Sequence, residues 1–184
     1  MDKYSETNRK LWNGWTSIHA ESKFYDLDAF KAGRCSLMPT ELEEVGDVVG
    51  KSLLHLQCHF GQDTLSWAKR DAEVTGVDFS DTAIDLARSL STELNIPAEF
   101  LCCDVYDLPE KLEKKYDIVF TSYGVLCWLR DLNRWGEIVS HFLKPGGVFY
   151  IVEFHPITTM LDENGEKFEF PYFHSSDAVR YETE

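Results

Sequence analysis

The chain has 184 residues, 43% of them hydrophobic and 14% aromatic, which is enough apolar material for the core of one globular domain. That composition excludes a disordered chain, and no apolar run approaches the roughly 18 residues of a membrane helix. The 18 basic and 32 acidic residues give a net charge of −14, which disfavours nucleic acid and anionic membrane surfaces as partners.

The five cysteines are scattered along the chain and form no CxxC pair. Their odd number predicts thiols in a reducing compartment rather than a disulfide framework. The first residues, Met1 to Ser5, contain no apolar stretch, so we expect no secretory signal. Together these features predict a cytoplasmic protein.

Three regions of the sequence differ in composition and in hydrophobic periodicity. Residues 1–48 are aromatic and polar with weak periodicity, and residues 49–156 alternate between short apolar runs and helical patterns. Residues 157–184 form an acidic tail that Gly165 and Pro171 interrupt.

The middle region predicts five strands separated by helices. Apolar runs place the strands at 52–56, 73–78, 99–102, 116–121 and 148–153. Helices are predicted at 63–70, after a cap at Ser80 or Asp81, at 109–115 and at 132–143, with a tight turn at 145–147. This alternation predicts an α/β fold, a doubly wound and mostly parallel sheet with helices on both faces. In such sheets the ligand binds outside the carboxyl ends of the strands.

Two acidic residues follow neighbouring strands. Asp78 ends the second strand. An acid there can accept hydrogen bonds from both hydroxyls of a ribose, or it can merely stabilise the N-terminus of the next helix through the helix dipole. Asp104 follows the third strand. An acid there can accept a hydrogen bond from the exocyclic amine of an adenine, or it can merely stabilise a turn in the loop. The first strand-to-helix loop, 57–61, should be glycine-rich in a cofactor domain but contains only Gly61. Composition alone therefore does not make it a nucleotide loop.

Five segments, in this order, resemble the motifs of class I S-adenosylmethionine-dependent methyltransferases. They are Leu53–Thr64, with a variant Leu-Gln-Cys-His-Phe-Gly loop similar to that of a bacterial branch, Val74–Ser80, Asp104–Val105, Tyr116–Gly124 and Leu143–Gly147. The resemblance covers about residues 48 to 156. It departs from the family at His55, where an acid is usual, and at Gln57 and His59, where glycines are usual.

The resemblance implies a Rossmann-like methyltransferase fold in residues 49–156 that binds S-adenosylmethionine and releases S-adenosylhomocysteine. It implies methyl transfer to a small-molecule acceptor by in-line displacement, for which the protein supplies position and electrostatics. The residues expected at the cofactor are Gln57, His59, Gly61, Asp78, Phe79, Asp104, Val105, Thr121 and Tyr123.

No catalytic residue can be assigned from the sequence. His19, His155 and Tyr123 are candidates for a general base, which is needed only if the nucleophile is protonated. We expect no metal site, because the His55 and His59 pair straddles a strand and a loop.

Several aromatic residues lie near the expected site. The rings of Tyr123 and Trp128 either favour a sulfonium by cation–π attraction or simply pack. Trp12, Trp15 and Tyr25 belong to residues 1–48, a segment that related enzymes fold over the cofactor as a lid or use to select the substrate. An N-terminal helix packed on the sheet edge explains these three residues equally well.

Only 28 residues follow Pro156, too few for the two strands and the helix that end related domains. We therefore expect either that 157–184 begins a truncated C-terminal part or that a second copy of the chain covers the exposed sheet edge. Two other functions stay open. One is a cofactor-binding module or fragment without catalysis. The other is a NAD-type oxidoreductase, which Asp78 suits but the glycine-poor loop does not.

Overall fold

The computed structural model describes residues 2–162 and 164–173. It divides into two compact units, Met1–Val152 and Glu153–Glu184, a division that leaves the predicted boundary at residue 48 untested. The first unit contains a parallel sheet of five strands in the order β3-β2-β1-β4-β5. The strands are β1 (Ser52–Leu56), β2 (Glu73–Asp78), β3 (Glu99–Cys102), β4 (Tyr116–Ser122) and β5 (Leu143–Val152). This order confirms the doubly wound fold.

The last strand begins earlier than predicted. Residues 145–147 do not form a turn ahead of β5 but lie inside it, so the predicted tight turn is wrong. The pairing register with β4 shifts between Tyr116 and Ile118, and Gly146 adopts a φ of 78°. The Pro-Gly-Gly sequence therefore lies in a bulge between Leu143 and Val148, which pair with Tyr116 and Ile118 of β4 on either side of it.

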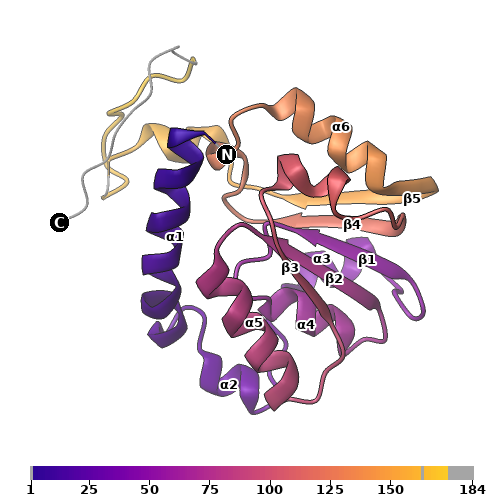
Figure 1. Ribbon diagram of the computed structural model, residues 1–184. Helices are drawn as coiled ribbons and strands as arrows, with labels where there is room; N and C mark the ends of the chain where they lie inside the picture. The colour runs from indigo at the N-terminus through magenta and orange to yellow at the C-terminus, as the bar shows by residue number, and fades with distance from the viewer. Residues whose placement is uncertain (1, 163, 174–184) are drawn as a thin grey trace. The chain divides into compact units, whose positions relative to one another are not determined.

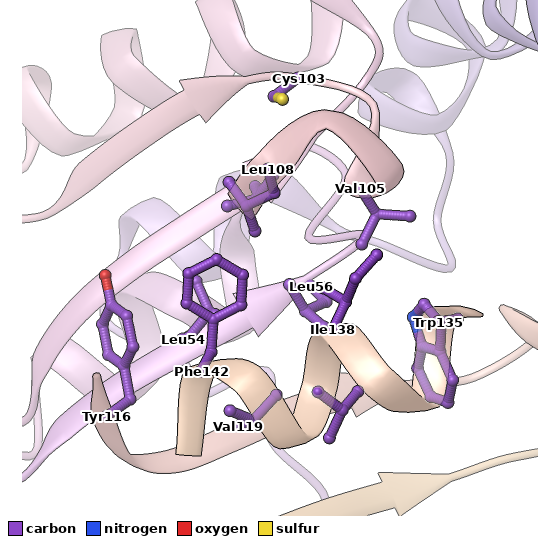
Figure 2. Packing of buried hydrophobic residues seen from close by; sticks show 12 residues of the cluster. Leu54, Leu56, Cys103, Val105, Leu108, Tyr116, Val119, Trp135, Ile138 and Phe142 are labelled. Carbon is purple, nitrogen blue, oxygen red and sulfur yellow. The ribbon is translucent and has the colours of Figure 1, made fainter. Parts of the chain in front are cut away.

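Helices cover both faces of the sheet (Figure 1). On one face, α3 (Pro39–Val45), α4 (Gln62–Ala68) and α5 (Asp81–Glu93) pack over the strands. On the other face lie α6 (Leu132–Phe142) and the 3-10 helix η1 (Val105–Glu110). Figure 2 shows Ile138 and Phe142 of α6 beside Leu56 and Leu54 of β1, with Trp135 farther along α6 in the same cluster. The sheet is thus buried on both sides, and its carboxyl edge is left for a site.

Side-chain caps decide where two helices begin. Ser80 caps α5 as predicted, since its Oγ accepts a hydrogen bond from the Ala83 amide at 3.1 Å. The helix predicted at 109–115 is wrong, because η1 starts directly after Asp104, whose carboxylate accepts from the Tyr106 amide at 3.0 Å. Pro109 lacks the N–H that would extend an α-helix beyond this turn.

The N-terminal segment is helical. It contains α1 (Lys3–Glu21) and α2 (Leu27–Lys31) ahead of α3. α1 stands beside α5 (Figure 1). Asn13 of α1 hydrogen-bonds both Ser80, at 2.6 Å, and Asp81, so α1 crosses the end of β2.

The second unit contains the 3-10 helix η3 (Pro156–Met160) and an isolated antiparallel bridge between Leu161 and Phe168. Residues 174–184 of the predicted acidic tail lie outside the described residues. Within the described part of the chain, no disulfide forms and no helix is both long and apolar enough to cross a bilayer.

Candidate cofactor site

The loop between β1 and α4 has an unusual backbone. Gln57, His59 and Gly61 have φ values of 53°, 50° and 77°, all in the left-handed region. This region costs a residue with a side chain roughly 1–2 kcal/mol. The chain therefore keeps a conformation suited to glycine at two positions where it has Gln57 and His59. Hydrogen bonds from the loop to its surroundings offset this strain.

Asp78 is the main anchor of that loop. Its Oδ2 accepts a hydrogen bond from the His59 amide at 2.8 Å, and its Oδ1 accepts one from the Ser80 amide at 2.9 Å. The residue is only 8% exposed, and burial raises the pKa of its carboxyl to about 6 against the opposing effect of these bonds. Asp78 thus joins the end of β2 to the loop that follows β1.

Asp104 lies beyond the neighbouring strand β3 and is also buried. Its Oδ1 accepts from the Tyr106 amide, and its Oδ2 accepts from Arg130 Nη1 at 3.2 Å. The Arg130 guanidinium lies 4.0 Å from the centre of the Tyr106 ring. The same nitrogen of Arg130 donates to the Ser5 hydroxyl of α1 at 2.8 Å. No motif in the sequence points to Arg130.

Six rings, which we call the aromatic cap, meet at the loop: Trp12, Trp15, His19, Tyr25, His59 and Trp128. The Trp12 ring centre lies 5.3 Å from that of His59 and 5.5 Å from that of Trp128. The His19 ring stacks on Tyr25 at 5.1 Å. The N-terminal segment therefore covers the loop at the carboxyl edge, the location expected of a lid.

His59 lies in the middle of the cap as a neutral imidazole. Burial, and to a lesser degree the charge of His19, lowers its pKa to about 3. Both of its ring nitrogens are buried without a hydrogen-bond partner in the described part of the chain. Buried polar atoms normally have a hydrogen-bond partner, so these two nitrogens have bonding capacity that a bound molecule or a water can use.

The remaining predicted site residues differ in what their side chains do. Thr121 is fully buried, and its hydroxyl donates a hydrogen bond to the Leu56 carbonyl at 3.1 Å. The side-chain oxygen Oε1 of Gln57 lies 3.4 Å from the same hydroxyl. Val105 belongs to the core beneath α6, and Phe79 is half-buried. Tyr123, directly after β4, is 39% exposed. The structure brings Gln57, His59, Gly61, Asp78 and Thr121 together, while the Val105 side chain faces the core. Their contact with a cofactor stays a prediction.

The candidate bases are also placed. His19 lies in the aromatic cap, where burial lowers its pKa. His155 belongs to the second unit, where its Nδ1 accepts from the Ile157 amide at 3.2 Å. His55 does not share a site with His59, since its Nδ1 is 2.8 Å from the Thr64 hydroxyl. Within the described residues, no group of three or more His, Cys, Asp or Glu side chains could hold a metal ion.

A wholly parallel sheet with acids at two neighbouring strand ends defines a doubly wound domain built for a nucleoside-containing cofactor. A family model described as a methyltransferase domain matches residues 53–147. The chain belongs to this family, with the fold of the class I S-adenosylmethionine-dependent methyltransferases.

Relatives with known names agree with this assignment. The chain is 28% identical over 151 residues to a ubiquinone biosynthesis O-methyltransferase of Chromobacterium violaceum, covering 82% of this chain and 60% of the relative. It is 30% identical to phosphoethanolamine N-methyltransferase 1 of Triticum aestivum, again over 82% of this chain but only 31% of the relative. The chain thus spans 60% or less of the length of these two relatives.

Solved structures share the fold at lower identity. A complex of DhpI with S-adenosylhomocysteine has a TM-score of 0.61 at 22% identity, covering 87% of this chain and 71% of DhpI. The [4+2]-cyclase SpnF has a TM-score of 0.63 at 20% identity, covering 80% of this chain and 59% of SpnF. The second of these is named for a reaction other than methyl transfer, so the fold alone does not fix the chemistry.

Proposed function

We propose that the chain transfers the methyl group of S-adenosylmethionine to a small-molecule acceptor by in-line displacement. The observation that carries this proposal is the His59 amide bonded to Asp78, which fixes the loop after β1 beside a buried carboxylate. Asp104 adds a second carboxylate at the next strand end. Membership of the methyltransferase-domain family supports the same reaction.

The side chains at this edge fit the proposed cofactor. Asp78 would accept the ribose hydroxyls, and Asp104 would accept the exocyclic amine of the adenine. The unpartnered ring nitrogens of His59 leave polar capacity beside them. When bound, the cofactor supplies an activated methyl group on a sulfonium, and the chain has only to hold and align the two reactants. Alignment of this kind is worth roughly 7–11 kcal/mol of the barrier.

The aromatic cap has a separate part in the proposal. Rings from α1 lie within 6 Å of the loop and of Trp128, where they would exclude water from the reacting groups. Their faces also attract a positive sulfonium, which loses its charge in the reaction. The cap therefore combines the two alternatives open for these residues, packing and protection of the cofactor.

The acceptor is proposed to be a small molecule because the chain carries a net charge of −14, which opposes a polyanionic substrate. The names of the two relatives also refer to small molecules, one to the biosynthesis of ubiquinone and the other to phosphoethanolamine. These names differ in the acceptor atom, oxygen in one and nitrogen in the other, so they support the size of the acceptor and not its identity.

The test is calorimetric titration of the purified chain with S-adenosylmethionine, S-adenosylhomocysteine and NADH. We expect micromolar binding of the first two and none of NADH. Asp78→Asn should lower the affinity for S-adenosylhomocysteine at least tenfold, because it removes the negative charge that we propose binds the ribose. Asp85→Asn is the matched control, since it removes an equal charge from an exposed side chain of α5.

Circular dichroism would establish that each variant is folded before its affinity is interpreted. A folded wild-type chain that binds neither sulfur compound contradicts the proposal and favours a module without catalysis. Cofactor binding without label transfer from methyl-labelled S-adenosylmethionine to any of a panel of small alcohols, phenols and amines would point the same way. NADH binding would favour the oxidoreductase.

A further inference from the structure

The side chain of Arg130 is held from several directions beside the proposed cofactor site. Its Nη1 donates to Asp104 Oδ2 at 3.2 Å and to the Ser5 hydroxyl at 2.8 Å. Its Nε lies 3.8 Å from the Asp2 carboxylate, and its guanidinium carbon lies 4.0 Å from the centre of the Tyr106 ring. The starts of α1 and η1 thus both hold the guanidinium, which leaves its planar fork of donors little freedom to turn.

The backbone next to Arg130 is fixed as well. Asp131 caps α6, since its Oδ1 accepts from the Arg134 amide at 2.9 Å. The Tyr106 hydroxyl donates to the Asp131 carbonyl at 3.0 Å and accepts from the Asp131 amide at 2.9 Å. A hydroxyl has both a donor and acceptor lone pairs, so the two bonds can form together. Tyr106 therefore positions the main chain beside Arg130 with its hydroxyl and the guanidinium with its ring.

These contacts determine how the Asp104 carboxylate is oriented. Its Oδ1 accepts from the Tyr106 amide at 3.0 Å, and its Oδ2 accepts from Arg130. An ionised carboxylate has more lone pairs than these two bonds use, so it can accept a further donor. Because the side chain is only 6% exposed, that donor has few directions from which to approach. The two bonds therefore fix the direction in which Asp104 can bind a ligand.

A carboxylate fixed in this way distinguishes a donor from an acceptor. The exocyclic amine of adenine donates a hydrogen bond, whereas the carbonyl oxygen at the same position of hypoxanthine only accepts one. An ionised Asp104 attracts the first group and repels the second. A site built to bind an N–H group rejects an analogue without it, because a buried polar group is then left unpaired. The rejection requires a carboxylate that cannot turn away from the base.

We propose that Arg130 is a positioning residue that fixes Asp104 for the recognition of adenine. The guanidinium acts through the carboxylate and not on the base. It holds Asp104 in one orientation and supplies the positive charge that a buried carboxylate needs. This proposal rests on the proposed function, because it takes the adenine of the cofactor to lie at Asp104. It adds a residue on which the selection of the base depends.

The alternative is that Arg130 only anchors the start of α1. Its contact with Asp2 fits that role, because Asp2 caps the helix by accepting from the Tyr4 and Ser5 amides at 2.9 Å and 2.8 Å. An anchor affects folding, and it changes the affinity for every ligand of the site alike. A positioning residue changes the discrimination between two bases. The ratio of two affinities therefore separates these roles.

The experiment measures this ratio by calorimetry on the full chain. The two probes are S-adenosylhomocysteine and S-inosylhomocysteine, in which a carbonyl oxygen replaces the adenine amine. The variants are Arg130→Gln, which removes the charge, and Arg130→Lys, which keeps it. Arg134→Gln is the matched control, because it breaks an exposed pair with Glu137. Circular dichroism establishes that each variant is folded.

The wild-type chain should bind the adenosyl compound about tenfold or more tightly than the inosyl compound, the effect of one hydrogen bond to a charged group. Arg130→Gln should reduce this ratio to about threefold or less, because the adenosyl compound loses more affinity than the inosyl compound. Arg130→Lys should give an intermediate ratio, since an ammonium can pair with Asp104 but does not reproduce the rigid fork that also holds Ser5. Arg134→Gln should keep the wild-type ratio within about twofold.

The proposal is overturned if both Arg130 variants keep the wild-type ratio, even where the two affinities fall together. If Arg130→Gln does not fold, Arg130→Lys decides in the same way. A wild-type chain that binds both probes equally also overturns the proposal, but its binding of S-adenosylhomocysteine would leave the proposed methyl transfer standing. A folded chain that binds neither probe contradicts the proposed function and this proposal with it. The two failures are therefore distinguishable.

Discussion

The Arg130 guanidinium lies 3.2 Å from the Asp104 carboxylate and at the same time holds the Ser5 hydroxyl at the start of α1. The Arg130 side chain thus connects Asp104, which we propose binds the adenine, with α1, the helix that carries three of the six rings of the aromatic cap. Because the Asp104 side chain is only 6% exposed, the ion pair is shielded from solvent on that side. The stability of the start of α1 should therefore depend on the ion pair between Arg130 and Asp104.

Arg130→Gln should loosen the beginning of α1. A charged hydrogen bond of this kind contributes about 1 kcal/mol, which corresponds to a roughly fivefold loss of amide protection. Hydrogen exchange should show that loss in residues 3–10 and leave α5 unchanged. Arg134→Gln, which breaks an exposed pair with Glu137 inside α6, should have no such effect. Equal protection of residues 3–10 in both variants would contradict the coupling.

Trp12→Ala should open the aromatic cap. The indole contacts His59, Trp15 and Trp128, and its loss should lower the free energy of unfolding by about 2 kcal/mol. Water then reaches His59, so its pKa should move upward from about 3 toward the ordinary value of 6.5. Imidazole titration by NMR measures this shift. Ile18→Ala, on an exposed position of α1, should leave the His59 pKa in place.

Gly61→Ala tests the backbone of the loop. An added Cβ would lie 2.7 Å from the Phe100 ring, and the residue has a φ of 77°. We expect a loss of about 2–3 kcal/mol in the free energy of unfolding, measured by denaturant titration. Gly136→Ala in α6 is the control, because nothing lies within 4 Å of its added Cβ. That variant should gain up to about 1 kcal/mol from helix propensity. A loop that tolerates alanine would not have the conformation described.

Glu41 should make stability depend on pH. Its pKa is raised from 4.5 to about 7 in the folded chain, so between these values the folded state binds more protons than the unfolded state. Stability must then fall as the pH rises from 4.5 to 7, by roughly 3 kcal/mol at most, at about 1.36 kcal/mol per pKa unit.

Glu41→Gln should flatten this part of the stability curve, as followed by chemical denaturation at several pH values. Glu43→Gln should retain the wild-type slope. Asp78, whose pKa is raised from 3.8 to about 6, contributes a slope of the same sign below about pH 6, and both variants keep it. An unchanged slope in Glu41→Gln would show that Glu41 titrates normally.

The positions of β1, β2 and β3 follow from the sequence to the residue, and the cap at Ser80 does too. These features depend on apolar runs and on side chains that bond their own neighbours. The two local errors, the helix at 109–115 and the turn at 145–147, occurred where Asp104 starts a helix early and where Pro145 to Gly147 form a bulge inside β5. A cap two residues away decided the first outcome, and the pairing of β5 with β4 on both sides of the bulge decided the second.

The candidate site divides in the same way. Asp78 and Asp104 were identifiable because the carboxyl ends of parallel strands share one edge, so their position along the chain suffices. Arg130 was not identifiable. Arg130 meets Asp104 across 26 residues of sequence, so no local pattern connects the two.

The sequence by itself therefore determined the order of strands and helices along the chain, the acids at the strand ends and the family of the protein. Each of these depends on residues that are close in sequence, or on the rule that the carboxyl ends of parallel strands share one edge of the sheet. The tertiary structure alone decided which side chains lie over the loop and which cation pairs with Asp104. These are contacts between distant segments, and their energies depend on burial and distance in three dimensions, which no local pattern encodes.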